Sequence, residues 1–145
     1  MKKITTSLFF VIVSPILFAQ NVKKIETLKD GWDLSYTYTG EVKDGKPNGM
    51  GVAKYKSGNA VRYVGNFQNG MYNGKGTMFF KEGAFLTGEW KNGKLNGKGS
   101  FLSESGILYI GNFVNGVKEG KGILFYKDNG MIMGNFSNDK LNGRG

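Results

Sequence analysis

The 145-residue chain contains no cysteine and no histidine. Without these residue types it has no disulfide framework, and Ser-His-Asp and Cys-His nucleophilic sites are excluded. It also lacks the thiolate and imidazole ligands of common zinc and haem sites. Acidic residues are few, 11 against 20 lysines and arginines, and Glu41, Glu89 and Glu119 recur at repeat positions that we expect to face solvent. We therefore expect no catalytic site, no metal site and no cofactor.

Long apolar runs are also scarce, and the only one lies within the first 20 residues. A basic start at residues 2–3 precedes an apolar stretch at residues 8–18, which Pro15 interrupts, and the small residue Ala19 follows. This order predicts a secretory signal peptide over residues 1–19. An uncleaved anchor is the alternative, but the stretch is shorter than the roughly 20 residues that a spanning helix needs. Cleavage would leave a soluble periplasmic or secreted chain.

Positive charge predominates. The formal net charge is +9, and removing Lys2 and Lys3 with the signal peptide lowers it to +7. The excess is spread along the chain, so it permits an anionic partner but also accounts for ordinary solubility. The anionic partners that we consider are a lipid surface and an envelope polymer, and we expect no nucleic-acid binding.

Glycine, in contrast, is abundant, and 23 of the 24 glycines recur on one grid. The period is 25 residues once and 23 thereafter, which predicts a repeat array over residues 38–145. Only Gly31 lies off the grid, and Asp139 replaces one glycine. The last unit is cut short, so we expect either a frayed end or a truncated gene product. The units are marked by Gly40, Gly65, Gly88, Gly111 and Gly134.

Each unit has the sequence pattern of a β-hairpin. Tyr63, Gly65 and Phe67 alternate with more polar residues, which predicts a strand with one buried face. Asn69-Gly70 then predicts a tight reversal, because both residue types accept positive φ. Equivalent dipeptides recur in the other units, so successive hairpins should form one long antiparallel meander.

A Gly-x-Gly motif opens the second strand of every unit. Glycine inside a strand costs roughly 0.5–1 kcal/mol relative to alanine, so the motif needs a structural reason. We expect aromatic rings of the neighbouring strand to lie flat where both glycines lack a Cβ. The repeat positions that we expect to build this core are Tyr38, Gly40, Tyr63, Gly65, Phe67, Gly74, Gly76, Gly88, Trp90, Gly97, Gly99, Tyr109, Gly111, Phe113, Gly120 and Gly122.

The pattern Tyr-x-Gly-x-Phe/Trp-x-x-Gly-x-x-x-Gly-x-Gly, with its 23-residue period, resembles the MORN repeat family, here of an exported bacterial type. Val42 departs from the second aromatic position, Leu86 and Ile132 depart from the first, and Asp139 replaces a turn glycine. The resemblance implies an all-β fold: an elongated, twisted, single-layer antiparallel sheet used for binding or scaffolding. The repeats start near residues 38, 63, 86, 109 and 132.

Residues 20–37 precede the array and are less regular. We expect a degenerate capping hairpin that covers the open edge of the first repeat. A flexible spacer with Trp32 packed onto the sheet is the alternative.

The middle residue of the Gly-x-Gly motif is cationic in four of five copies. Because its parity is opposite to that of the glycines, it should lie on the polar face, with copies roughly 10 Å apart. Such a ladder suits phosphate-bearing lipid head groups or another polyanion. The alternative is a solubilising row in which Lys98 pairs across the strand with Glu89. The five copies are Met50, Lys75, Lys98, Lys121 and Arg144.

Phe79 and Phe125 also have the parity opposite to the glycines. Either the second face of the sheet is partly apolar, as a dimer surface or glycan platform would be, or the strands twist enough to bury both aromatic sets in the core.

These observations predict a non-enzymatic exported protein that acts as a scaffold for protein–protein or cell-envelope interaction. The alternative is peripheral binding to anionic lipid head groups through the cationic ladder. Self-association through a face or an edge of the sheet is a further alternative.

Overall fold

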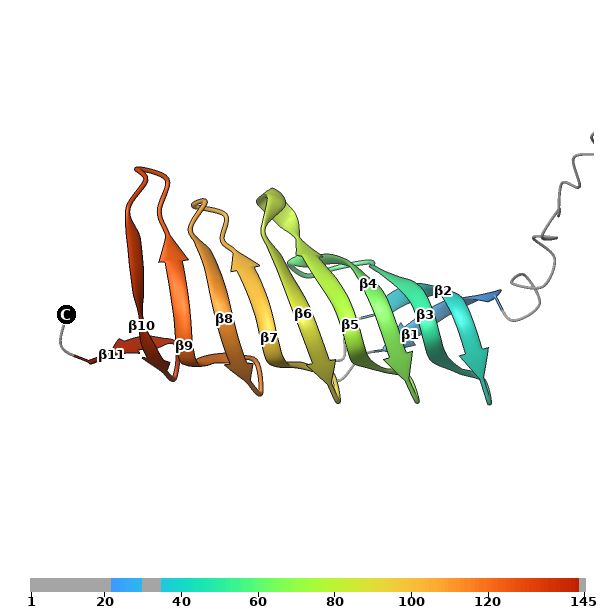
Figure 1. Cartoon of the computed structure of the whole chain (residues 1–145). Coiled ribbons are helices and arrows are strands. Elements are labelled where there is room, and N and C mark those ends of the chain that lie inside the picture. The colour runs from blue at the N-terminus through green and yellow to red at the C-terminus, as the bar shows by residue number, and fades with distance from the viewer. Residues whose placement is uncertain (1–21, 30–34, 144–145) are drawn as a thin grey trace, which may run out of the picture.

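The computed structural model describes residues 22–29 and 35–143. The predicted signal peptide, Trp32 and Arg144 lie outside these residues. The described residues form one sheet of 11 antiparallel strands in chain order, and Figure 1 shows them side by side along an elongated, twisted layer. The strands are β1 (Val22–Lys29), β2 (Ser35–Lys43), β3 (Lys46–Tyr55), β4 (Ala60–Gln68), β5 (Met71–Phe80), β6 (Phe85–Lys91), β7 (Lys94–Leu102), β8 (Leu108–Val114), β9 (Val117–Phe125), β10 (Met131–Ser137) and β11 (Lys140–Asn142).

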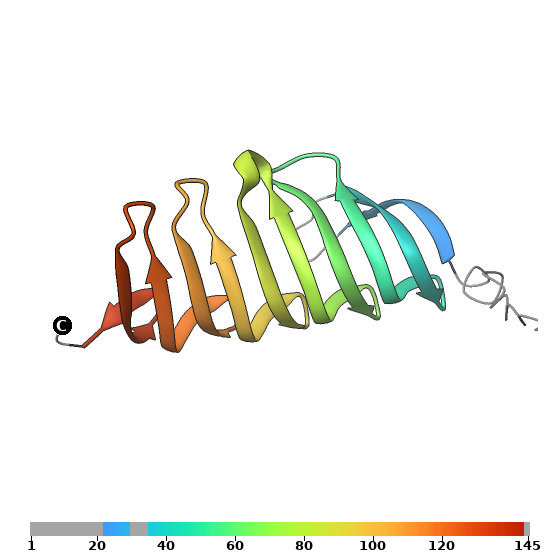
Figure 2. The same ribbon diagram turned by 45° about the horizontal axis from the view of Figure 1, so that its top comes forward.

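This architecture confirms the predicted all-β array of hairpins. One turn of 3₁₀ helix, η2 (Lys81–Gly83), connects β5 to β6. Figure 2 shows the same layer from a second direction, and all 11 strands belong to a single sheet. β1 pairs with β2 at the outer edge of the sheet, which is the position that a capping strand would occupy. β2 begins at Ser35, three residues before the predicted start of the array.

Two-residue turns close the hairpins because their residues accept positive φ. Asn69 has a φ of 51° and Gly70 a φ of 84°, as a type I′ turn requires. Asp139 replaces glycine in the last hairpin and has a φ of 64°, a region that aspartate enters more readily than most residues. Positive φ also recurs at Asp44-Gly45, Asn92-Gly93, Asn115-Gly116 and Asn138.

A β-bulge separates the turn end of each complete hairpin from the rest of the sheet. In the β4–β5 pair the register shifts between Gly65 and Phe67, and equivalent shifts occur in the β2–β3, β6–β7 and β8–β9 pairs. A bulge bends and twists the strand that contains it. The turn ends then hydrogen-bond to one another, since Gly93 N donates to Tyr72 O at 2.9 Å and the next turn repeats this bond.

The core lies on one face of the sheet, which we call the ring face. Tyr38, Tyr63 and Tyr109 are fully buried there. Each hydroxyl donates to the backbone carbonyl three residues ahead, at 2.8, 3.2 and 3.1 Å respectively. A Cβ at Gly122 would lie 2.5 Å from the Tyr109 hydroxyl oxygen. The ring therefore occupies the space that a side chain at the second glycine of the motif would need.

Burial also changes the acidity of these phenols. It raises the pKa of Tyr38 to about 12, and the neighbouring Glu41 and Tyr36 add to the shift. Burial likewise raises the pKa of Tyr63 and Tyr109. The neutral phenol is favoured because an ionised oxygen would lose its hydration in this apolar layer.

The first glycine of each motif has a different role from the one that the sequence suggests. Gly74 and Gly97 have φ values of 91° and 122°. A Cβ at Gly97 would lie 2.7 Å from Glu89 Oε2, and none of its nearest atoms belongs to an aromatic ring. The prediction that both glycines seat rings is wrong for the first, because the bulge places that residue in a left-handed conformation.

The third repeat also departs from the others. Leu86 occupies the position of the buried tyrosines, so no tyrosine ring lies over Gly99. The side-chain atoms nearest to a Cβ at Gly99 would be Leu95 Cδ2 at 2.8 Å and Phe113 Cδ2 at 3.3 Å. Trp90 packs edge-on against the neighbouring Tyr63 ring, with 5.4 Å between the centroids. This repeat therefore has a smaller side chain where its neighbours have a ring.

Candidate functional site

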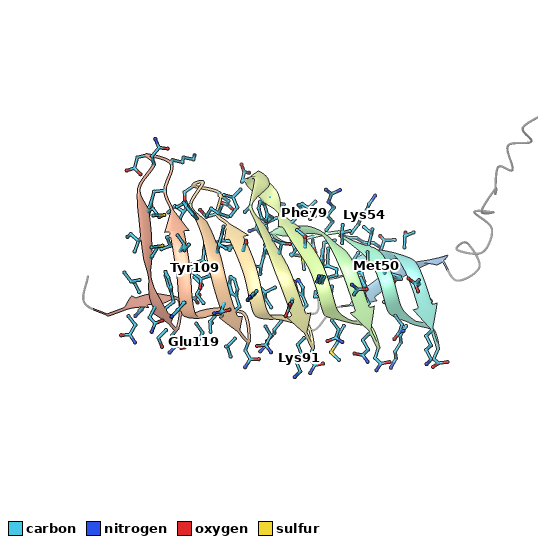
Figure 3. All side chains as sticks on the ribbon, viewed as in Figure 1. Met50, Lys54, Phe79, Lys91, Tyr109 and Glu119 are labelled. Atoms are coloured by element: carbon cyan, nitrogen blue, oxygen red, sulfur yellow. The ribbon has the colours of Figure 1, made fainter. Side chains whose placement is uncertain are left out.

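The face opposite the rings, which we call the back face, carries the predicted cationic positions. Lys75, Lys98 and Lys121 are exposed, and we call them the cation row. They lie opposite Glu89, Asn112 and Asn135 on the neighbouring strands. Successive lysines are two strands apart, which corresponds to about 10 Å. Met50 takes the same position in the first repeat and is 51% exposed (Figure 3).

The register does not place Lys98 directly opposite Glu89, as the predicted pairing requires. The register places Glu89 opposite Lys75, while the β6–β7 register shifts between Gly88 and Trp90. The bulge therefore removes the direct cross-strand position that a regular hairpin would have given to Lys98.

The residue after the first glycine of a repeat has a role that sequence reasoning missed. Glu41 Oε1 accepts a hydrogen bond from Met50 N at 3.0 Å, and Asn66 Nδ2 donates to Lys75 O at 3.2 Å. Both bonds join this side chain to the backbone of the middle residue of the Gly-x-Gly motif, beside the bulge. The recurrence of Glu or Asn at this position was the signal in the sequence. Glu41 is therefore a backbone partner as well as a surface charge.

Two further rows cross the back face parallel to the cation row, because residues directly opposite in the ladder share a face. We call the row farthest from the two-residue turns the apolar row. It contains Phe79, Phe85, Leu102, Leu108, Phe125 and Met131. Between it and the cation row lies the central row, which contains Val52, Val64, Thr77, Thr87, Ser100, Ile110, Ile123 and Met133.

Phe79 and Phe125 thus lie on the second face and not in the core. Neither belongs to the cluster of buried side chains on the ring face, so their burial together with the first aromatic set is wrong. The sheet is one layer thick, and twist alone does not enclose its second face. The Arg62 guanidinium lies over the Phe79 ring, 4.4 Å from its centroid. Figure 3 shows Phe79 and Lys54 toward the end of the strands opposite the two-residue turns.

Several apolar side chains of the central and later strands are exposed on this face. Ile110 is 44% exposed, Met131 54% and Met133 67%. A contiguous apolar surface on a soluble sheet is typical of an interaction site. The back face thus combines a row of cations with an adjacent apolar surface, and this arrangement suits binding.

Within residues 22–29 and 35–143, no group of three or more acidic side chains is placed to hold a metal ion. In the same part of the chain, no helix has the length and apolarity needed to cross a bilayer.

The repeat geometry agrees with a comparison of the sequence with protein families. The family model described as MORN repeat matches residues 38–60, 63–85, 87–107, 109–131 and 133–145. These segments cover well over half of the chain. The chain belongs to the MORN repeat family. MORN repeats in general bind proteins or membrane lipids. No curated protein matches this chain in a sequence search.

The five matches follow the hairpins of the structure. The second MORN repeat, residues 63–85, spans most of β4, all of β5 and η2. Each of the first four repeats thus contributes its middle Gly-x-Gly residue to the back face and its first aromatic position to the ring face. The positions of the cation row therefore follow directly from the MORN period. Arg144, the equivalent residue of the last repeat, lies outside the described residues.

Proposed function

We propose that this MORN repeat protein is an exported, non-enzymatic scaffold that binds a protein partner through its back face. One observation carries the proposal: the apolar and central rows form a partly exposed, mostly apolar surface across consecutive strands, with the cation row beside it. Protein interfaces have this composition, in which an apolar centre is bordered by polar and charged groups. The lack of histidine and cysteine in the sequence supports a role in binding over catalysis.

A substitution in the central row tests this proposal. Ile110 lies in β8 opposite Ser100 and Ile123, so Ile110→Asp places a charge on the back face without entering the core. Val114→Asp is the matched control, because Val114 belongs to the same strand, is 46% exposed and lies beside a turn. The immobilised chain would be incubated with the exported fraction of its host.

We expect a partner that is retained by the wild type and by Val114→Asp, and lost with Ile110→Asp. Retention should persist near 0.5 M salt, because apolar contacts are not screened by ions while exposed charge pairs are. Equal retention by all three chains would show that the back face is not the binding surface.

Binding to anionic lipid head groups through the cation row is the second candidate. The exposure and regular spacing of Lys75, Lys98 and Lys121 favour it, whereas Glu89 within the same row weakens it. Changing all three lysines to glutamate lowers the charge of the cleaved chain from +7 to +1. If lipid binding is the function, the wild type should co-sediment with anionic vesicles at low salt, and the variant should not. Equal behaviour of two folded chains would leave the lysines as a solubilising row.

Export is part of the proposal and rests on the order of basic, apolar and small residues before Gln20. Intact-mass analysis of the exported chain tests it. The expected mass corresponds to a chain that begins at Gln20, and a mass that includes residues 1–19 would contradict it.

A further inference from the structure

A groove opens on the ring face, on the side of the sheet opposite the proposed back-face interface. Its volume is about 470 Å³, and its walls come from β3 to β6 and from the turn ends of the third and fourth repeats. Met78, Phe80 and Leu86 line it from the sheet, and Leu95 and Val117 line it from the turn ends. The groove thus lies between the sheet and the bent ends of the hairpins.

The groove coincides with the departure of the third repeat from the MORN pattern. In three other repeats a tyrosine at this position lies flat over the second glycine, as Tyr63 does over Gly76. Leu86 provides no ring, and Leu95 instead approaches Gly99. The space that a ring would occupy is therefore left partly open between Leu86, Leu95 and the next turn. The groove thus lies where the third repeat has leucine in place of the tyrosine ring.

The lining defines the chemistry of an occupant. It is mostly aliphatic and aromatic, and Tyr72 and Trp90 form part of its floor. Asn59 and Asn115 contribute exposed amide groups, which pair with peptide donors and acceptors. Lys94 is the single charged residue among those that line the groove.

A second cation, Lys118, follows the lining residue Val117 in the sequence. Its Nζ lies 5.2 Å from the centroid of the Tyr109 ring. Because Lys94 is the charged residue of the lining, charge complementarity favours an acidic occupant over a basic one.

From these features we propose that the groove binds an extended segment of a partner protein that inserts one large apolar side chain, with an acidic residue next to it. The side chain fills the space beside Leu86, the amides of Asn59 and Asn115 bond to the segment's backbone, and Lys94 faces its carboxylate. This site lies on the opposite face from the back face, so a result that refutes one of the two proposals does not refute the other.

Blocked dipeptides test the chemistry of this site. The probe is acetyl-Phe-Glu-amide, compared with acetyl-Ala-Glu-amide and acetyl-Phe-Lys-amide. Binding would be followed by NMR through the indole N–H of Trp90 and the backbone N–H groups of Gly93 and Gly116, which lie in the groove lining. We expect saturable shifts of these signals with acetyl-Phe-Glu-amide, and affinities lower by about tenfold for the alanine peptide and about threefold for the lysine peptide.

Restoring the tyrosine of the MORN pattern tests whether the probe binds beside residue 86. Leu86→Tyr should fill the groove, by its own ring or by displacing Leu95, and should lower the affinity for acetyl-Phe-Glu-amide by more than about tenfold. Ile132→Tyr is the matched control, because it restores the same repeat position in the fifth repeat, away from the groove. It should leave the affinity unchanged. Ala60→Phe, which adds volume at the opposite wall, is a second blocking variant if Leu86→Tyr does not fold.

The proposal is overturned if acetyl-Phe-Glu-amide produces no saturable shifts in the groove. It is also overturned if the alanine peptide binds equally well, or if a folded Leu86→Tyr or Ala60→Phe chain binds the probe like the wild type. A preference for the lysine peptide would refute the acidic character of the segment.

Discussion

Replacing Gly122 by alanine isolates the contact between ring and glycine on which the core is built. Gly122 does not have a positive φ, so alanine fits its backbone. Strand propensity alone would make the substitution stabilising by roughly 0.5–1 kcal/mol. The added Cβ, however, would lie 2.5 Å from both Cε2 and the hydroxyl oxygen of Tyr109. Propensity and packing therefore predict effects of opposite sign.

The packing effect should be the larger one. Tyr109 is fully buried, and its neighbours Phe113 and Phe136 lie edge-on at centroid distances of 5.3 and 4.9 Å, so the ring has little room to move. Overfilling such a site costs typically 1–3 kcal/mol. Displacing the ring also weakens its hydroxyl bond to Asn112 O, worth about 0.5–1.5 kcal/mol. After the gain in propensity, we expect a net loss of about 1–3 kcal/mol.

Urea unfolding measures this change, and two controls make it specific. Gly130→Ala should have an effect near zero, because a Cβ there would meet only Asp128 Oδ1 at 3.0 Å and more distant atoms of Tyr126. In a Tyr109→Leu background, Gly122→Ala should cost less, since leucine leaves room as Leu86 does in the third repeat. An unchanged or raised unfolding midpoint for Gly122→Ala would refute the packing of rings over glycines.

Three further predictions concern the same core and its turns. Tyr63→Phe removes the hydroxyl that donates to Asn66 O and should lower the unfolding free energy by about 1 kcal/mol in urea titrations; no loss would show that the bond is not stabilising. Asn69→Ala should lower the unfolding free energy by about 1–2 kcal/mol and Asn69→Gly should leave it nearly unchanged, because φ is positive at this position. Equal losses for the two variants in the same titration would contradict the turn assignment. Because burial raises the folded-state pKa of Tyr38 from 10.0 to about 12, its stabilising contribution should be complete below pH 10 and decline from about pH 10 to 12. Phenolate absorbance recorded with circular dichroism would show this, and buried tyrosines that ionise near pH 10 in the folded chain would contradict it.

The hairpins could be predicted from the sequence because their determinants are local. Asn69-Gly70 accepts the dihedral angles of a tight turn, and the aromatic residues before it alternate with polar ones. The bulge between Gly65 and Phe67 could not be predicted, since two extra residues on β5 change every cross-strand position beyond them. The equivalent bulge in the β6–β7 pair leaves Glu89 without a directly opposite residue in β7.

The two faces of the sheet differ in how much the sequence reveals. Parity places Phe79 opposite the glycines, but its partial exposure follows from the absence of a second layer over this face of the described sheet, which parity does not determine. The departure at Leu86 is visible in the repeat pattern. Its consequence is not, because the groove depends on how Leu95, from a bent turn end, packs over Gly99.

Site-specific photo-cross-linking in the living host tests the binding role most directly. A photoreactive residue at Ile110 places the probe in the centre of the back face, and the same residue at Val114 is the control. The proposed function predicts one protein cross-linked from Ile110 and not from Val114. Cross-links from Ile110 only to lipid, or the same products from both positions, would contradict it.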